Sequence, residues 1–156
     1  KDGTVTAANA SQISDGASAV VVMSAETAKK RGLKPLARIT GYAAGGVEPK
    51  WVMYAPVVAI ANLEKKTGKA TSSYDLVELN EAFSSAGCAV TKESKLDPKR
   101  VNVHGGAVAL GHPIGASGAR ILTTLLYEMQ RRDAKKGLAT LCIGGGMGIA
   151  VCLARD

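Results

Sequence analysis

Apolar residues gather in short continuous runs along this chain, and the stretches between the runs carry apolar residues at helical spacing. Short runs that are rich in Val, Leu, Ile and Ala are typical of buried strands. The pattern predicts strands over residues 19–23, 36–47, 76–79, 101–104, 138–143 and 149–154.

Start and stop signals for helices lie between these predicted strands. Ser24 can accept a hydrogen bond from the first turn of a helix, and Gly32 stands just past its end. Pro56 suits the first turn of the next helix, because an N–H is not needed there. The predicted helices cover residues 25–31, 56–66, 82–93 and the stretch that begins at Ala119.

The order of these elements indicates a fold class. The last two predicted strands are joined by the glycine-rich stretch 144–148, which is typical of an antiparallel pair around a tight loop. Alternating strands and helices before this pair predict an α/β fold with a mixed β-sheet covered by helices. Residues 1–16 are small and polar, which predicts loop structure and a boundary near residues 15–16. Because the chain begins at Lys1 without an initiator Met, we interpret it as a piece of a longer sequence.

Size and charge narrow the function classes. The chain has 156 residues, 46% hydrophobic and 4% aromatic, with a formal net charge of +7. A chain of this size can bury a core without disulfides or a metal. The basic clusters stand where predicted helices end, a position that the helix dipole favours for cations. With few aromatic residues and no binding motif, the charge predicts no nucleic-acid partner, and a small polyanionic ligand stays open. The clusters are residues 29–31, 65–66, 131–132 and 135–136.

Cysteine and histidine usage bounds the compartment and the metal chemistry. The three cysteines lack C-x-x-C spacing, which argues against a disulfide framework and fits a reducing, cytoplasmic compartment. Two histidines are too few for a zinc cluster, so we expect no metal site. The longest apolar stretch, residues 17–25, is shorter than the ~20 residues of a membrane span, so we expect no membrane partner.

Three loops that follow predicted strands each carry one polar or reactive side chain, namely Asn80, His112 and Cys142. Ligand sites in open α/β sheets gather where loops leave the strands. Each residue also has a structural alternative: Asn80 can cap a helix, His112 can be a hydrogen-bonded structural histidine, and Cys142 can be an apolar filler. Glycines beside His112 and Cys142 favour function, because they shape the backbone and let a substrate approach.

The remaining candidates favour structural roles. Cys88, within a predicted helix, and Cys152, in the last predicted strand, are expected to pack in the core. His104 is expected to be a neutral, hydrogen-bonded histidine, although it could line the same site. Ser117 is expected to cap a helix. The glycine spacing from Gly111 matches neither the dinucleotide-binding fingerprint nor the P-loop.

Three longer motifs stand in order along the chain, N-E-A-F at residues 80–83, G-G-A-V-A-L-G-H-P-I-G-A-S-G-A-R at residues 105–120 and C-I-G-G-G-M-G at residues 142–148. Together they resemble the C-terminal half of the thiolase family. N-A-S at residues 9–11 resembles the end of the family's CoA-binding loop region. The resemblance covers essentially the whole chain.

The resemblance implies an acyltransferase. Thiolases condense two acetyl-CoA to acetoacetyl-CoA and CoA through a Claisen condensation, or run the reverse thiolysis. The CoA thioester is the substrate, so no separate cofactor is expected, and the enzymes are usually homo-oligomers. The chain would divide into residues 1–15, the end of the CoA-binding loop region, and residues 16–156, a C-terminal thiolase domain. The family's nucleophilic cysteine belongs to the absent N-terminal half, so the chain alone is expected to be inactive.

The resemblance also implies roles for single residues. Cys142 matches the acid/base cysteine that removes a proton from the acetyl methyl carbon, and its surroundings can tune the thiol pKa toward neutral. His112 matches the histidine that activates the nucleophile. With a water held by Asn80, it also donates to the thioester oxygen as charge develops. The Gly144 N–H matches half of the second oxyanion hole, where bare backbone can approach the tetrahedral intermediate.

Two further residues are expected to bind substrate, Ser11 on the CoA pantetheine and Phe83 within N-E-A-F. A β-ketoacyl synthase shares the fold but uses Cys with two histidines, and Asn80 together with Cys142 argues against it. The other alternative is a non-catalytic acyl-CoA or lipid carrier of thiolase-like fold, which needs no acid/base pair. His104 stands where relatives often carry another polar residue, which leaves its role open.

Overall fold

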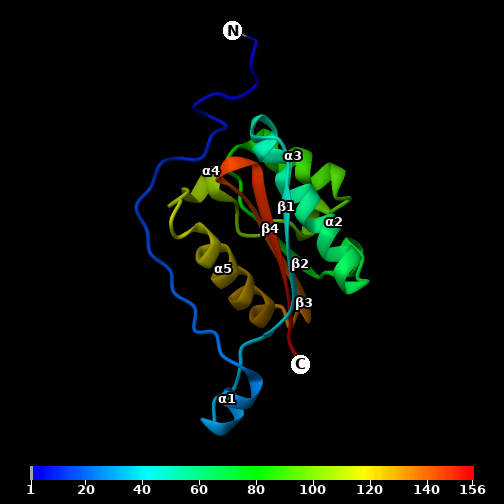
Figure 1. Cartoon of the computed structure of the whole chain (residues 1–156). Coiled ribbons are helices and arrows are strands. Elements are labelled where there is room, and N and C mark those ends of the chain that lie inside the picture. Colours follow the sequence, from blue (N-terminus) through cyan, green and yellow to red (C-terminus); the bar gives the residue numbers. More distant parts are fainter. Residues whose placement is uncertain (1) are drawn as a thin grey trace.

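A four-stranded mixed sheet forms the centre of the computed structural model, which describes residues 2–156 (Figure 1). The strands lie in the order β1 (Arg38–Gly46), β4 (Met147–Ala154), β3 (Lys136–Ile143) and β2 (Leu76–Leu79). β4 runs antiparallel to both β1 and β3, whereas β2 runs parallel to β3. The predicted α/β fold with a mixed sheet is therefore confirmed.

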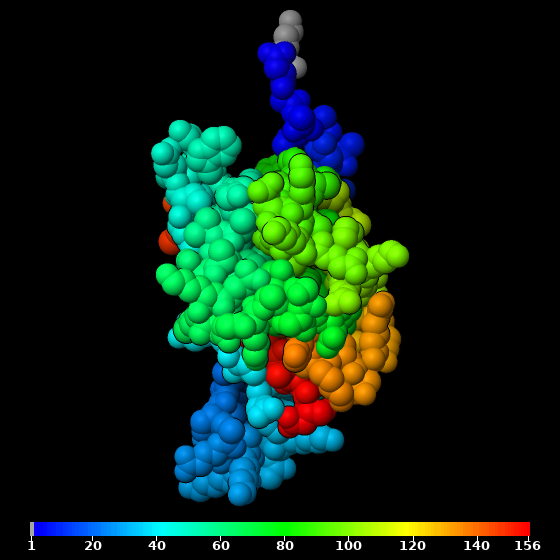
Figure 2. Space-filling view, turned by 90° about the vertical axis from the view of Figure 1, so that its right-hand side faces the viewer, coloured from blue at the N-terminus to red at the C-terminus, as the bar shows by residue number. Residues whose placement is uncertain are grey.

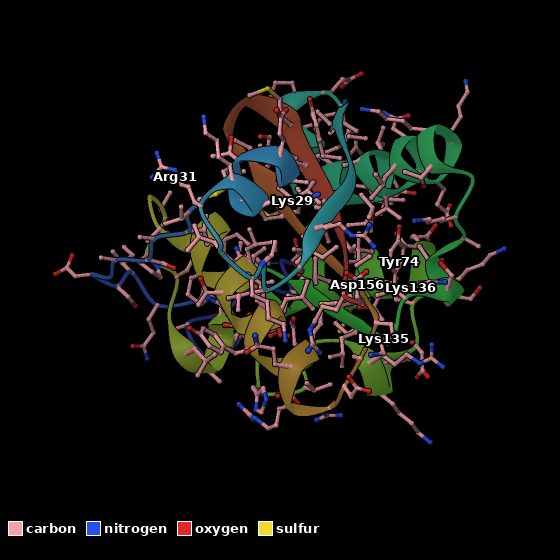
Figure 3. All side chains as sticks on the ribbon, turned by 90° about the horizontal axis from the view of Figure 1, so that it is seen from below. Lys29, Arg31, Tyr74, Lys135, Lys136 and Asp156 are labelled. Carbon is pink, nitrogen blue, oxygen red and sulfur yellow. The ribbon has the colours of Figure 1, made fainter. Side chains whose placement is uncertain are left out.

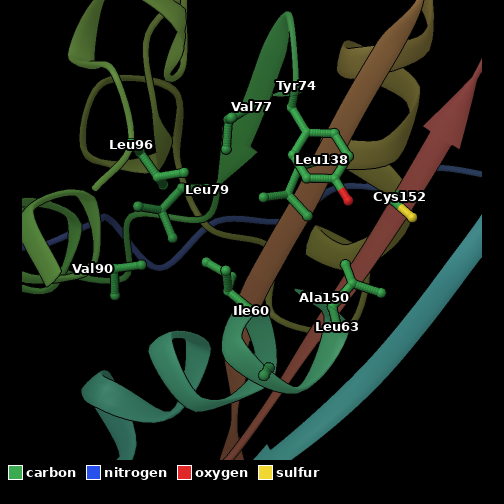
Figure 4. Packing of buried hydrophobic residues seen from close by; sticks show 11 residues of the cluster. Ile60, Leu63, Tyr74, Val77, Leu79, Val90, Leu96, Leu138, Ala150 and Cys152 are labelled. Atoms are coloured by element: carbon green, nitrogen blue, oxygen red, sulfur yellow. The ribbon is translucent and has the colours of Figure 1, made fainter. Parts of the chain in front are cut away.

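Helices cover both faces of this sheet. α2 (Ala55–Thr67) and α3 (Ser84–Glu93) pack on one face, and α5 (Ser117–Arg131) packs on the other (Figure 1). Fully burying a large aliphatic side chain stabilises the folded state by about 1.5–3 kcal/mol, so the clusters on the two faces hold the layers together. The cluster on the α2 face includes Ile60, Leu63, Val77, Leu79, Val90 and Leu138 (Figure 4).

Several helix signals act as the sequence predicts. Ser24 Oγ accepts a hydrogen bond from Thr27 N–H at 3.1 Å and caps α1 (Ala25–Lys30). Gly68 ends α2 with a left-handed φ of 67°, a conformation that glycine adopts at little cost. The pattern does not predict the short helices, which are η1 (Pro49–Tyr54), η2 (Thr71–Ser73), η3 (Pro98–Arg100), α4 (Ala107–Leu110) and η4 (Gly144–Gly146).

The basic clusters stand largely at helix ends, as predicted. Basic side chains occupy the last turns of α1, α2 and α5. Figure 3, seen from below, shows Lys135 and Lys136 where β3 begins, at the opposite end of that strand from Cys142. Much of the positive charge therefore has a structural position and lies away from the candidate chemistry.

The strand predicted at residues 19–23 is wrong. This run pairs with no strand among residues 2–156, and Val21 and Val22 are 86% and 67% exposed. It belongs to a long segment that passes α5 and leads to α1 (Figure 1). The N-terminal residues and α1 project from opposite ends of the body (Figure 2). An apolar run forms a buried strand only where its backbone can pair with a neighbouring strand. In the described part of the chain no strand pairs with residues 19–23.

The strand predicted at residues 101–104 is also wrong. Val101 makes one parallel bridge to Val77, and the chain then turns at Asn102, whose φ is 47°. The Asn102 amide accepts a hydrogen bond from Leu79 N–H and donates one to the Leu79 carbonyl, both at 2.8 Å. The Asn102 side chain therefore forms hydrogen bonds with the backbone of β2 that the sequence analysis expected from another strand.

The two cysteines expected in the core behave differently. Cys152, on β4, is fully buried in the cluster of Figure 4, as predicted. Cys88 is exposed, so the packing prediction for it is wrong. The buried positions of α3 are Ala86, Gly87 and Val90, and Cys88 lies on the opposite face of the helix.

Candidate active site

The sheet brings Asn80 and Cys142 to one edge. β2 and β3 are parallel neighbours, with Leu79 paired to Thr140, so their carboxyl ends point the same way. Asn80 follows Leu79 directly, and its N–H donates to the Thr140 carbonyl at 3.0 Å. Cys142 stands two residues further along β3. Loops at such strand ends are where α/β sheets place ligands.

His112 meets Asn80 at this edge. The two side chains approach at 3.3 Å between Asn80 Nδ2 and His112 Nε2. Asn80 is 3% exposed, and its other polar atom, Oδ1, is buried without a hydrogen-bond partner among residues 2–156. An unpartnered acceptor of this kind suits a bound water or a substrate donor. Of the three loop residues, the structure therefore brings Asn80 and His112 into direct contact.

Ser117 is a site residue that the sequence does not reveal as one. Its side chain does not cap α5 as predicted, because its Oγ lies 2.6 Å from His112 Nδ1 and 3.0 Å from the Pro113 carbonyl oxygen. It is 1% exposed. The one feature of the sequence that could have indicated this contact is that Ser117 lies five residues after His112, where a turn leads into α5.

Electrostatics keep the His112 ring neutral. Burial lowers the pKa of His112 below its ordinary value, and the nearby Arg120 guanidinium lowers it further. Arg120 in turn lies 3.5 Å from the Glu78 carboxylate, which is 2% exposed. Burial raises the pKa of Glu78 to about 7, although Arg120 opposes the shift. The Arg120 guanidinium therefore acts on both the Glu78 carboxyl and the His112 ring.

Cys142 has a different environment. Its thiol contacts the Met53 sulfur of η1 at 3.9 Å, and this is its one side-chain hydrogen-bond partner among residues 2–156. Burial raises the pKa of the Cys142 thiol, so in this chain the surroundings shift it away from neutral. The sequence gives no hint of Met53, because nothing in its local pattern connects η1 to the loop after β3.

Glycines hold η1 against the Cys142 loop. Val47 N–H donates to the Gly146 carbonyl at 2.8 Å, and a Cβ on Gly146 would overlap the Val47 carbonyl oxygen. Gly145 and Gly146 also have left-handed φ values of 78° and 88°. Gly144, in contrast, is exposed, and a Cβ there would meet nothing within 4 Å. The space over Gly144 is therefore open to a ligand.

The N-terminal segment runs between the two loops that carry Asn80 and His112. Ser11 N–H donates to the Ala82 carbonyl at 3.0 Å, and Ala10 bridges to Phe83. His112 N–H donates to the Gln12 carbonyl at 3.0 Å. Ser11 and the half-buried Phe83 therefore both lie next to the Asn80–His112 pair.

His104 lies elsewhere. Its Nε2 is 2.5 Å from Glu128 Oε2 and 3.0 Å from Arg131 Nη1, so the hydrogen-bonded role expected for it is confirmed. The His104 contact is the main reason why the pKa of Glu128 is lowered, and Arg132 also contributes. His104 therefore packs against the C-terminal end of α5, where these side chains form a structural cluster.

An open pocket of about 430 Å³ lies between residues 14–18 and the loop that follows His112.

Within residues 2–156 no three His, Cys, Asp or Glu side chains gather closely enough to hold a metal ion. The described helices also include none with the length and apolar character that crossing a membrane requires.

Family comparison identifies the class of protein. The family model described as "Thiolase, C-terminal domain" matches residues 33–155, and "Thiolase, N-terminal domain" matches residues 1–26. The first match covers most of the chain, and the three motifs at the sheet edge agree with it. The chain belongs to the thiolase family.

Individual relatives narrow the comparison. The acetyl-CoA acetyltransferase of Paracoccus denitrificans is 59% identical over 155 residues, which are 99% of this chain and 40% of that relative. The Pseudomonas aeruginosa acetyl-CoA acetyltransferase is 59% identical over 156 residues, 100% of this chain and 40% of the relative. The chain therefore spans about 40% of the length of these curated relatives.

Solved structures agree with the sequence relatives. The Bacillus anthracis acetyl-CoA acetyltransferase matches with a TM-score of 0.96 and 49% identity, over 99% of this chain and 39% of that one. Human mitochondrial 3-ketoacyl-CoA thiolase in complex with CoA matches with a TM-score of 0.90 and 42% identity, over 100% of this chain and 40% of that one. The thiolase fold expected from the motifs is confirmed.

Proposed function

We propose that this chain is the acid/base part of an acetyl-CoA acetyltransferase, which condenses two acetyl-CoA to acetoacetyl-CoA and CoA or runs the reverse thiolysis. The observation that carries the proposal is the 3.3 Å contact between Asn80 and His112 at the sheet edge that also holds Cys142. The names of the relatives support the substrate class. The nucleophilic cysteine would come from the part of the enzyme that this chain does not span.

His112 would act first, as the base for that nucleophile. Its Nε2 takes the thiol proton, and the resulting thiolate attacks the thioester carbonyl of the first acetyl-CoA. The CoA sulfur leaves and recovers the proton from Nε2, so the acetyl group remains on the enzyme. A histidine that is neutral at rest suits this role, because its lone pair is available.

Cys142 would act in the condensation step. Its thiol proton would pass to the neutral His112, and the resulting thiolate takes a proton from the methyl carbon of the second acetyl-CoA. The carbanion attacks the enzyme-bound acetyl group, so that the new C–C bond forms and the bond to the nucleophilic sulfur breaks. That sulfur then takes the proton from His112, which returns His112 and Cys142 to their neutral forms. Because burial raises the pKa of the Cys142 thiol, its thiolate is a stronger base once formed. The open space over Gly144 supports an oxyanion site at its N–H.

Asn80 and the N-terminal segment would serve binding. A water on the unpartnered Asn80 Oδ1, together with protonated His112, would stabilise the enolate oxygen. Ser11 and Phe83 lie beside this pair and would contact the CoA thioester. We assign residues 1–15 to the end of the CoA-binding loop region and residues 16–156 to the C-terminal domain. We further propose a cytoplasmic homo-oligomer.

The test is the CoA-dependent cleavage of acetoacetyl-CoA by this chain alone and by the chain joined to the N-terminal part of the Paracoccus denitrificans enzyme. We expect turnover in the joined protein and none in the chain alone. Turnover by the chain alone would contradict our assignment of the nucleophile to the other part. Binding of acyl-CoA by the joined protein without turnover would favour a carrier.

Substitution then tests the acid/base assignment within the joined protein. Cys142→Ala is expected to lower turnover by about 100- to 10,000-fold, because a proton-transfer group contributes about 10²–10⁴-fold. Cys88→Ala is the matched control, because Cys88 is exposed on α3, and it should leave the rate unchanged. Normal turnover in Cys142→Ala would refute the role of this thiol.

A further inference from the structure

Ser117 is buried at the start of α5, yet its hydroxyl faces the candidate site. It is 1% exposed, and its Oγ has two neighbours within hydrogen-bond distance. One is the Pro113 carbonyl oxygen at 3.0 Å, and the other is His112 Nδ1 at 2.6 Å. Because a buried hydroxyl with two fixed partners has few ways to distribute its single proton, the direction of each hydrogen bond can be worked out.

The proton count starts at Pro113. A carbonyl oxygen accepts and never donates, so the Ser117 hydroxyl is the donor in its hydrogen bond to Pro113, whose carbonyl also accepts from the Ala116 and Ser117 N–H groups. Towards His112, Ser117 Oγ can then only accept, and His112 Nδ1 must carry a proton. Burial and Arg120 hold the pKa of His112 below its ordinary value, which favours the neutral ring. A neutral ring has one N–H, which leaves His112 Nε2 without a proton.

The other side of the ring agrees with this assignment. Asn80 Nδ2 lies 3.3 Å from His112 Nε2 and is a donor, which matches an unprotonated Nε2. The three hydrogen bonds then run in one direction, from Asn80 through the imidazole to Ser117 and on to the Pro113 carbonyl. Each of the three hydrogen bonds therefore pairs one donor with one acceptor.

We propose that Ser117 is a positioning residue, which fixes His112 in the tautomer with its proton on Nδ1 and thereby presents the Nε2 lone pair at the sheet edge. The tautomer follows from the hydrogen bonds of the ring in its neutral form. Its use as a base rests on the proposed function, because only there does Nε2 take a proton from a thiol. When it does, the S–H bond breaks, an N–H bond forms at Nε2, and Ser117 continues to accept from Nδ1.

Nitrogen NMR of this chain, labelled with ¹⁵N-histidine, tests the tautomer directly. The sequence has two histidines, and His104→Gln identifies the signals of His112. Above pH 8 the neutral ring of His112 should give a protonated Nδ1 and an unprotonated Nε2. A protonated Nε2 in the unaltered chain would overturn the proposal without any variant at position 117.

Variants show whether Ser117 is the cause. Ser117→Ala should change the tautomer to a mixture or to Nε2–H, whereas Ser117→Thr keeps a hydroxyl and should restore Nδ1–H. Ser18→Ala is the matched control, because Ser18 also places a hydroxyl against α5, 3.2 Å from Thr123 Oγ1, and it should leave the His112 signals unchanged. A folded Ser117→Ala with the original tautomer would refute the proposal. Should Ser117→Ala not fold, the spectra of the unaltered chain and of Ser117→Thr decide.

Kinetics of the joined protein separate positioning from binding. Ser117→Ala is expected to lower kcat by at least about tenfold with little change in KM, because mispositioning the tautomer of a catalytic histidine affects the chemical step. The acidic limb of its pH profile should move as well. If the joined protein shows no thiolase turnover, the proposed function fails, whereas the NMR result for the tautomer stands. An unchanged kcat in Ser117→Ala would leave Ser117 a structural residue and contradict its positioning role.

Discussion

His112 and Cys142 lie at the same edge of the sheet, but their surroundings are built from different groups. The His112 side consists of side chains that hydrogen-bond to one another, from Asn80 to Ser117. The Cys142 side consists of a sulfur contact to Met53 and of backbone that approaches closely at Gly146. Side-chain hydrogen bonds therefore organise one side, and close packing of backbone organises the other.

The difference explains how each group holds its proton. The pKa of His112 is lowered by burial and by Arg120, and the pKa of Cys142 is raised by burial. Both shifts favour the neutral form, imidazole on one side and thiol on the other. The site at rest therefore holds no charge on either group, and a proton has to move before the proposed chemistry begins. The hydrogen bonds of His112 determine which ring nitrogen can take that proton. Burial on the Cys142 side determines how far the pKa of the thiol is raised.

The largest expected effect comes from the backbone of the Cys142 side. Gly146→Ala would place a Cβ against the Val47 carbonyl oxygen at a residue whose φ is 88°. Left-handed strain costs about 1–3 kcal/mol, and overpacking adds a similar amount, so the free energy of unfolding should fall by about 2–6 kcal/mol. Chemical denaturation measures it.

Gly144→Ala is the control for this prediction. The same loop holds Gly144, but a Cβ there meets nothing within 4 Å, so its free energy of unfolding should change by less than about 0.5 kcal/mol. Equal losses in the two variants would mean that the close approach of η1 does not hold this side together.

On the His112 side, the next effect is a pH dependence of stability. Glu78 has a pKa of about 7 when folded against an ordinary value of 4.5, so between these pH values the folded state binds more protons than the unfolded state. Stability is therefore lost as pH rises from about 4.5 to about 7, by up to about 3 kcal/mol. Glu78→Gln should remove this loss.

The measurement is urea denaturation of the unaltered chain and of Glu78→Gln at several pH values in that range. Glu48→Gln is the control, because Glu48 is exposed and pairs only with Lys50 in the described chain, and it should keep the pH dependence. Parallel curves for the unaltered chain and Glu78→Gln would show that the buried pair with Arg120 does not titrate in this range.

Local signals predicted most of the fold. Proline, glycine and capping residues mark where helices begin and end, and β2 has the bounds that its apolar run predicts, residues 76–79. The predictions fail where the structure of a segment depends on which other segment it contacts. The run at residues 19–23 reads as a strand but meets no other strand in the described residues, and at Asn102 a side chain replaces the strand backbone. The sequence pattern shows which secondary structure a segment can adopt, and the contacts of the folded chain determine which one it adopts.

The site divides in the same way. The structure joins Asn80 and His112, which the motifs had placed in one candidate site, although only Asn80 follows a strand end. Ser117 looked like a helix cap, since sequence spacing does not show where a hydroxyl points. Met53 lies 89 residues from Cys142 in the chain, and only the packing of η1 on the loop brings the two sulfurs together.

The smallest expected effect concerns this sulfur contact. Met53→Ala should let water reach the Cys142 thiol and lower its pKa toward the ordinary value. A lower pKa raises the thiolate fraction, and the thiolate is the form that iodoacetamide alkylates. The rate of iodoacetamide alkylation at Cys142, followed by peptide mass spectrometry at pH 7.5, should therefore rise by about 3- to 10-fold.

The pH profile of alkylation separates acidity from access. A lower pKa moves the midpoint of the profile to lower pH, whereas easier access raises the plateau at high pH and leaves the midpoint in place. Met147→Ala is the matched control, because Met147 is 49% exposed and pairs with Ile143 at the start of β4, and its midpoint should not move. A midpoint that stays constant in Met53→Ala would mean that Met53 does not shield the thiol. The raised pKa of the Cys142 thiol would then come from burial by groups other than the Met53 side chain.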